Sequence, residues 1–201
     1  MRKTTQKYGI EIPKCVKHAH SIDRANGNSL WCDALAKEMM EVGVAFEVLE
    51  ACARPPHGWN RVISHLIWDI KMDITRQAQW VLDRHKTPSP EGSTYTGVVS
   101  MESMRIAFPY AALNKTKVCA ASICNAYLQV PSSCKDYIIC GPEFGLKNVG
   151  KIALVHQALY GGKTAGKYFR NHLRSCMHHL NFTSCPADPD VWMRPAQHSD
   201  R

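Results

Sequence analysis

The chain has 201 residues, of which 45% are hydrophobic and 21% charged, an ordinary globular composition that excludes disordered and fibrous classes. Its net charge of +8 favours a polyanionic partner such as nucleic acid without identifying one. No apolar run reaches the roughly 18 residues of a membrane span, and the first residues lack the apolar stretch of a signal peptide, so we expect a cytoplasmic or nuclear protein that is not secreted and has no membrane partner.

Residues 1–28 mix charge, glycine and proline without a hydrophobic period, and we expect an irregular N-terminal segment there. The pattern changes at Ser29, where apolar residues begin to recur at the spacing of one helical face and predict a helix as far as Gly43. These residues are Trp31, Leu35, Met39 and Val42. Asn28 or Ser29 can accept hydrogen bonds from the free amides at the start of this helix.

Residues 61–74 alternate apolar and polar side chains, as a half-buried strand does. Residues 78–82 alternate again after a short interval, so the two segments predict a β-hairpin. The polar, proline-containing segment 85–97 predicts a loop.

The second half of the chain predicts further helices and strands in alternation. A helix begins at the cap Ser100 and ends near Asn114, with Pro109 inside it. Another helix follows over residues 165–181, where apolar side chains gather on one face. Strands are predicted over Lys117–Leu128, Tyr137–Cys140, Lys151–Leu159 and Val191–Met193.

This order of elements predicts an α+β or α/β fold with a mixed sheet. The hydrophobic patterns divide the chain into residues 1–28, residues 29–99 with the first helix and the hairpin, and residues 100–201 with the later strands and helices.

Nine cysteines are scattered through apolar segments, and their odd number favours reduced thiols over a disulfide framework. Two clusters of cysteine and histidine invite comparison with zinc sites, but neither has Cys-x-x-Cys spacing, so we expect structural roles and no metal. The clusters are Cys15, His18 and His20, and Cys176, His178 and His179.

Six short blocks, taken in order, resemble the reverse transcriptase domain of copia-type retrotransposons. They read LWCDALAKEM, AQWVLD, VCAASICNAYLQVP, DYIICGPEFG, KIALVHQALYGGK and ADPDVWMRPA. The resemblance implies a right-hand polymerase fold, of which residues 29–99 would supply fingers and residues 100–201 the first half of the palm, leaving the fold incomplete. The family's ancestral activity is RNA-directed DNA polymerisation.

The resemblance also implies where two magnesium ions would bind, because phosphoryl transfer of this kind depends on metal ions held by carboxylates. Ser122 stands at the position of the first metal-binding aspartate, and a neutral hydroxyl cannot replace that anionic ligand. The family's other two aspartates lie in a Tyr-x-Asp-Asp hairpin that would follow Arg201. We therefore expect no intact catalytic residue, no bound metal and no cofactor.

Other family positions survive as remnants. The Lys-Ala-Arg that would grip the incoming triphosphate reads Gln77, Ala78, Gln79, a substitution that removes both charges. Asn125, Ala126 and Tyr127 match the floor of the nucleotide pocket, and Gly161, Gly162 and Lys163 match a template-side turn. For Gln77 and Gln79 we favour the interpretation as the solvated face of a strand. Tyr127 is explained equally well as a packed aromatic or as a remnant of the pocket. Asp188 and Asp190 precede a strand and are expected to form caps or turns.

These residues predict a remnant of a retrotransposon reverse transcriptase that is inactive as this chain. Two alternatives stay open: a noncatalytic nucleic-acid-binding module, and an active polymerase fragment completed by downstream sequence. In each case we expect at most weak binding of an RNA or DNA template–primer. The integrase and RNase H partners of the ancestral polyprotein are not encoded in these residues.

Overall fold

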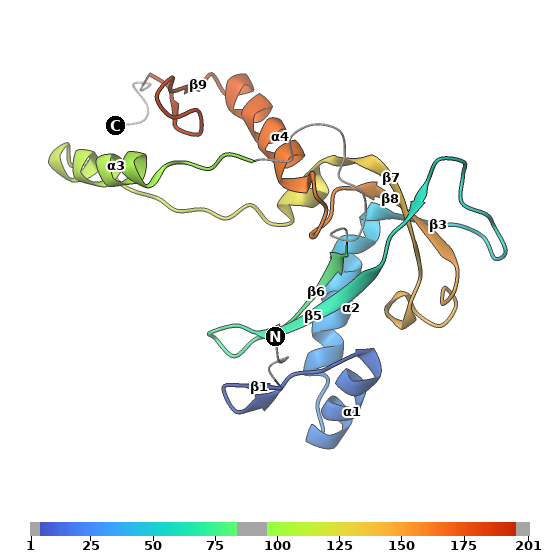
Figure 1. Cartoon of the computed structure of the whole chain (residues 1–201). Coiled ribbons are helices and arrows are strands. Elements are labelled where there is room, and N and C mark those ends of the chain that lie inside the picture. Colours follow the sequence, from blue (N-terminus) through green and yellow to red (C-terminus); the bar gives the residue numbers. More distant parts are fainter. Residues whose placement is uncertain (1–4, 84–95, 196–201) are drawn as a thin grey trace.

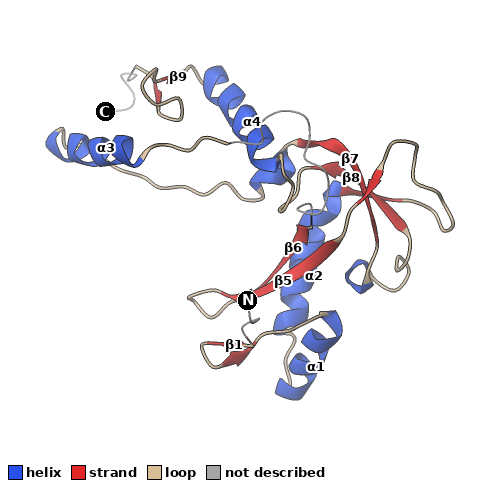
Figure 2. Ribbon diagram, viewed as in Figure 1, coloured by secondary structure: helices blue, strands red, loops and turns tan. Residues whose placement is uncertain are grey.

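The computed structural model describes residues 5–83 and 96–195. These residues form a mixed α+β fold with four α-helices, one four-stranded sheet and three two-stranded hairpins or ribbons (Figures 1 and 2). Within these ranges, no helix combines the length and apolarity needed to cross a bilayer. The predicted loop at 85–97 lies almost entirely outside the described residues.

Residues 5–28 contain a hairpin and a helix, so the prediction of an irregular stretch is wrong for this part of the N-terminal segment. Strands β1 (Gln6–Lys7) and β2 (Ile10–Glu11) form a small antiparallel hairpin, and α1 spans Val16–Asn26. Helix α1 ends at Gly27, whose φ of 62° is a left-handed conformation that favours glycine. The hairpin and α1 lie beside one end of α2 (Figure 1).

Helix α2 spans Leu30–Val42, as its hydrophobic period predicts, and a 3-10 turn follows over Gly43–Ala45. Asn28 Oδ1 accepts a hydrogen bond from the Leu30 amide at 3.3 Å. The main cap comes from α1: the buried carboxylate of Asp23 accepts hydrogen bonds from the amides of Trp31 and Cys32 at 3.1 and 2.8 Å. A carboxylate at a helix N-terminus satisfies free amides and interacts favourably with the helix dipole, so Asp23 joins α1 to α2.

Strands β5 (Ser64–Ile70) and β6 (Arg76–Leu82) form the predicted hairpin, with residue pairs running from Ser64–Leu82 to Ile70–Arg76. One face of the hairpin packs on α2 and buries Ala78, Trp80 and Leu82. Trp31 of α2 contacts Trp68 edge to face, with 5.8 Å between ring centroids. The alternation of side chains therefore determines which face of the hairpin is covered.

The central sheet has the strand order β3-β8-β7-β4. Its strands span Phe46–Val48 (β3), Ile152–Gln157 (β8), Pro131–Ile139 (β7) and Asn60–Arg61 (β4). Strand β4 pairs parallel with β7, and the other neighbours are antiparallel, so the sheet is mixed as expected.

The strand predicted over Lys117–Leu128 does not form. Residues 117–123 carry no regular structure and are exposed, and residues Ala126–Gln129 form a 3-10 turn. The strand begins only at Pro131, and it includes most of the segment predicted as Tyr137–Cys140. Alternating apolar residues alone do not make a strand, because the backbone groups also need a partner strand.

Helix α3 spans Met101–Leu113 and α4 spans Ala165–His179, close to their predicted limits. Figure 1 shows α3 at one end of the molecule, reached by two extended segments. Strands β9 (Thr183–Ser184) and β10 (Trp192–Met193) form a short ribbon after α4. The second of these was predicted, whereas its partner was not.

Candidate functional site

A cavity of about 300 Å³ lies between α2, the β5–β6 hairpin and the turn that precedes Ala126. Three residues that the sequence places in a nucleotide pocket line it: Gln77, Gln79 and Asn125. They come from segments that are far apart along the chain, so the fold brings them together. Tyr160, which begins the predicted template-side turn, also lines this cavity.

The two glutamines occupy the same parity of β6, and Ala78, of the other parity, lines the cavity between them. Their neighbours Ala78 and Trp80 are 3% and 0% exposed, whereas Gln77 and Gln79 are half-buried on the opposite face. Across the hairpin they pair with Asp69 and Ile67 of β5. Gln77 and Gln79 can therefore be both the polar side of strand β6 and part of the cavity wall.

Tyr127 and Ala126 are not among the residues that line the cavity. Tyr127 packs edge to face against Tyr160, with 4.9 Å between ring centroids, and against Phe169 at 6.1 Å. This position supports the packed-aromatic interpretation of Tyr127, since its neighbours are aromatic side chains. Asn125 precedes it in a left-handed conformation with φ of 51°, which asparagine tolerates better than most residues.

Ser122 is exposed on the segment that lacks regular structure, and it is not among the residues that line this cavity. Within residues 5–83 and 96–195, no group of three or more His, Cys, Asp and Glu side chains is arranged to hold a metal ion. The carboxylates on the cavity wall are Glu38 and Glu41 of α2. This donor set does not fit the two-magnesium centre that the family resemblance implies, because no strand-end carboxylate stands at position 122.

Sequence reasoning missed the charges that surround the cavity. Lys37, Lys71 and Arg76 contribute cations to its wall alongside the two glutamates. Arg76 is held in place by a hydrogen bond of 2.7 Å from its Nη1 to the Ile74 carbonyl. Lys71 and Arg76 flank the hairpin turn and lie outside the three positions, 77–79, that the family motif covers.

Glu38 connects α2 to the edge of β6. Its Oε1 accepts a hydrogen bond from the backbone amide of Trp80 at 2.8 Å. Burial raises the pKa of Glu38; the Trp80 amide opposes this rise, and the nearby charge of Glu41 adds to it. The carboxyl therefore loses its proton at a higher pH in the folded chain than in the unfolded chain.

Replacement of Glu38 by glutamine should raise the melting temperature at pH 7 and flatten its pH dependence. In the wild type, the stability that the protonated carboxyl contributes is complete below the ordinary pKa of 4.5 and is lost as the pH rises through the raised folded value. Glutamine keeps an acceptor for the Trp80 amide without that loss. Glu38→Ala is the control and should melt lower, because the Trp80 amide loses its partner. Melting curves from pH 4 to 7 that coincide for Glu38→Gln and wild type would contradict this assignment.

The predicted turn at residues 161–163 joins β8 to α4. It docks on the hairpin through a hydrogen bond from the Leu82 amide to the Tyr160 carbonyl at 2.9 Å. Gly161 has φ of 81°, and a Cβ there would overlap the Leu82 carbonyl oxygen, so only glycine fits. Gly162 donates its amide to the Leu159 carbonyl at 3.1 Å, and Lys163 is half-buried beside it. Burial raises the pKa of the Tyr160 hydroxyl, and the neighbouring Tyr127 raises this pKa further.

Asp188 and Asp190 form caps and turn contacts, as predicted. Asp188 Oδ2 accepts hydrogen bonds from the Ser103 hydroxyl at 2.6 Å and the Ser100 amide at 2.9 Å, at the start of α3. These bonds hold the pKa of Asp188 far below its usual range. Asp190 makes a two-point ion pair with Arg170 of α4, at 2.8 and 2.9 Å. Both carboxylates therefore fasten α3 and α4 to the segment before β10.

The cysteine and histidine clusters also make separate local contacts. His18 Nε2 lies 3.4 Å from a carboxylate oxygen of Glu11, and His20 Nδ1 lies 3.0 Å from Cys32 Sγ. Cys176 Sγ lies 3.7 Å from His172 Nε2 on the same helix. All nine cysteines are free thiols in the structure.

No protein-family model, curated protein or solved structure matches the chain significantly. The interpretation of the cavity therefore depends on its own geometry and on the order of the sequence blocks.

Proposed function

We propose that the chain is a catalytically inactive derivative of the fingers and palm of a copia-type reverse transcriptase. The observation that carries this proposal is the shared cavity of Gln77, Gln79 and Asn125, three positions that the family resemblance assigns to one nucleotide pocket. Residues 77–79 and 125 could have lain on opposite sides of the molecule. Their convergence is what a nucleotide pocket derived from this family would require.

Two features support inactivity. The charges that would hold a triphosphate are replaced by glutamines, and charge-assisted hydrogen bonds of this kind stabilise binding by about 1.5–3 kcal/mol each. At the metal position, Ser122 offers an exposed neutral hydroxyl. Metal ions stabilise such transition states by several kcal/mol, and each loss of about 1.4 kcal/mol slows a reaction about tenfold.

A primer-extension assay with a labelled primer on an RNA template and magnesium tests this proposal. We expect no extended product from the purified chain above a protein-free reaction. Ser122→Asp should not restore extension either, because the new carboxylate would stand on an exposed segment without a second metal ligand. Template-directed extension by the wild-type chain that disappears in Tyr127→Ala would overturn the proposal.

A noncatalytic nucleic-acid-binding module is a second candidate, favoured by the net charge of +8 and by three cations on the cavity wall. Such a module would bind the same primer–template with an affinity that falls linearly on a logarithmic salt scale. Absence of binding at low salt would exclude this candidate and leave the first unaffected.

A further inference from the structure

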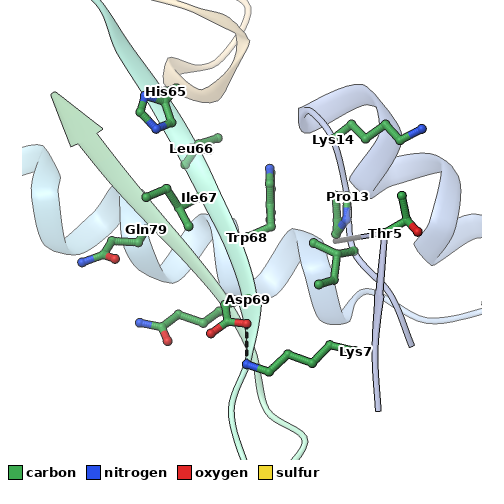
Figure 3. Close-up of a pocket in the computed structure, with 12 residues that line it drawn as sticks. Thr5, Lys7, Pro13, Lys14, His65, Leu66, Ile67, Trp68, Asp69 and Gln79 are labelled. Atoms are coloured by element: carbon green, nitrogen blue, oxygen red, sulfur yellow. Dashed lines mark hydrogen bonds and ion pairs between the residues drawn. The ribbon is translucent and has the colours of Figure 1, made fainter. Parts of the chain in front are cut away.

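A groove of about 580 Å³ lies between the N-terminal segment and the β5–β6 hairpin (Figure 3). One wall is the segment from Thr5 to Lys14, and the other is β5 from His65 to Asp69 together with the glutamines of β6. Its volume falls in the range of ligand-binding pockets, roughly 300–1,000 Å³. It is separate from the cavity between α2 and Asn125, although both share the two glutamines.

Among the described residues, no second strand pairs with the edge of β5 that faces away from β6. Hydrogen bonds from the Lys71 amide to the Thr75 carbonyl and from the Asp83 amide to the Ile63 carbonyl show that odd-numbered residues of β5 bond to β6. The even-numbered residues therefore direct their amides and carbonyls outward. Within the described residues, no hydrogen bond involves the backbone amide of Leu66 or Trp68, and both residues line the groove.

On the opposite edge of the hairpin, along β6, two outward backbone amides already have hydrogen-bond partners. The outward amides of Trp80 and Leu82 on β6 donate to the Glu38 carboxylate at 2.8 Å and the Tyr160 carbonyl at 2.9 Å. Unpaired backbone groups on a strand edge are a template for another strand. The contrast between the two edges makes the β5 edge the place where the hairpin can still accept a partner.

The groove combines apolar walls with positive charge. Ile12 and Pro13 face it from the N-terminal segment, opposite Ile67 of β5. Figure 3 shows Lys7 reaching across one end to Asp69, with 2.6 Å between Nζ and Oδ1, whereas Lys14 lies on the same wall without contacting Asp69. The single carboxylate of the groove is thus already paired, and the exposed Lys14 is left to attract an anion.

We propose that this groove binds an extended acidic peptide, which adds to the β5 edge as a further strand. The backbone of the peptide would pair with the amides and carbonyls of Leu66 and Trp68, a stretch of about 10 Å along the strand. One row of its side chains would lie toward Ile12 and the other toward Ile67, and a carboxylate would lie near Lys14. This site is independent of the polymerase ancestry proposed above.

Fluorescence anisotropy with a labelled peptide of alternating glutamate and valine tests the site. We expect saturable one-to-one binding to the full chain. The same peptide with methylated backbone nitrogens on alternate residues should bind at least about tenfold more weakly, because it cannot form the strand ladder. Lys14→Glu should weaken binding about fivefold, whereas Lys17→Glu, the same charge change on an exposed part of α1 outside the groove, should leave it unchanged.

Three results would overturn the proposal. The first is no saturable binding of the peptide. The second is equal binding of the methylated peptide, which would indicate charge attraction without strand pairing. The third is binding of a single-stranded oligothymidylate that Lys14→Glu weakens, with no binding of the peptide, which would assign the groove to nucleic acid.

Discussion

Replacement of Trp80 by alanine is expected to lower the free energy of unfolding by about 3–5 kcal/mol. The Trp80 side chain is fully buried and packs edge to face on Phe46, with 4.9 Å between ring centroids, and on Phe144 at 6.3 Å. These rings join the hairpin to β3 and to the turn after β7. Loss of the indole would leave a cavity where three elements meet, and the strand that carries Gln77 and Gln79 would lose its anchor.

Urea unfolding followed by circular dichroism measures this loss, and Trp59→Ala is a matched control. Trp59 is half-buried and meets only the exposed His156 edge to face at 5.8 Å among the aromatic contacts of the described residues. Its removal should cost clearly less than that of Trp80. If the two variants shifted the urea midpoint equally, Trp80 would not be the centre of the core.

The hairpin was predictable because its two alternating segments are each other's partners, so the local pattern contains most of the information that determines the structure. The register from Ser64–Leu82 to Ile70–Arg76 buries the residues that the alternation selects. Helix α2 was predictable for the same reason, since one face repeats at helical spacing over its whole length.

Helix α1 was not predictable from its pattern, because it is short and only Ala19, Ile22 and Asp23 are buried. Its buried Asp23 is a polar residue that sequence reasoning places at the surface. That carboxylate is stable inside because it accepts two amides from α2, a long-range arrangement that no local period reveals.

The segment from Lys117 to Leu128 was predicted to form a strand and does not form one. Its apolar residues alternate well enough to suggest a strand, yet Val118 and Ile123 are 59% and 52% exposed. No partner strand pairs with residues 117–125 in the described part of the chain, so their backbone groups have no strand to which they can hydrogen-bond. Ser122 is consequently exposed on an extended segment.

The candidate site was predictable in part. The resemblance to reverse transcriptases singled out Gln77, Gln79 and Asn125, which do share a cavity. It did not reveal Glu38 or the cations at Lys71 and Arg76, because their contribution depends on the packing of α2 and on the hairpin turn. Tyr127 was placed in the pocket by resemblance, whereas the structure packs it against Tyr160.

The double substitution Gln77→Lys with Gln79→Arg should increase affinity for a deoxynucleoside triphosphate by about 10- to 100-fold. A charge-assisted hydrogen bond contributes about 1.5–3 kcal/mol, and about 1.4 kcal/mol corresponds to a tenfold change in the dissociation constant, so two unscreened bonds would exceed this gain. Both positions are only half-buried on the cavity wall, and solvent screening lowers the expected gain to the stated range. Added positive charge anywhere on the chain would attract a triphosphate weakly, and a control must remove that contribution.

Isothermal titration of magnesium-bound deoxythymidine triphosphate into wild type, the double variant and a charge-matched control tests the proposed ancestry most directly. The control, Gln6→Arg with Asn60→Lys, adds the same two charges at exposed positions outside the cavity. If the hairpin descends from a triphosphate-gripping finger, the double variant should bind at least about tenfold more tightly than wild type, and the control should change affinity by less than about threefold. Equal gains in the two variants would contradict the proposed ancestry of the cavity.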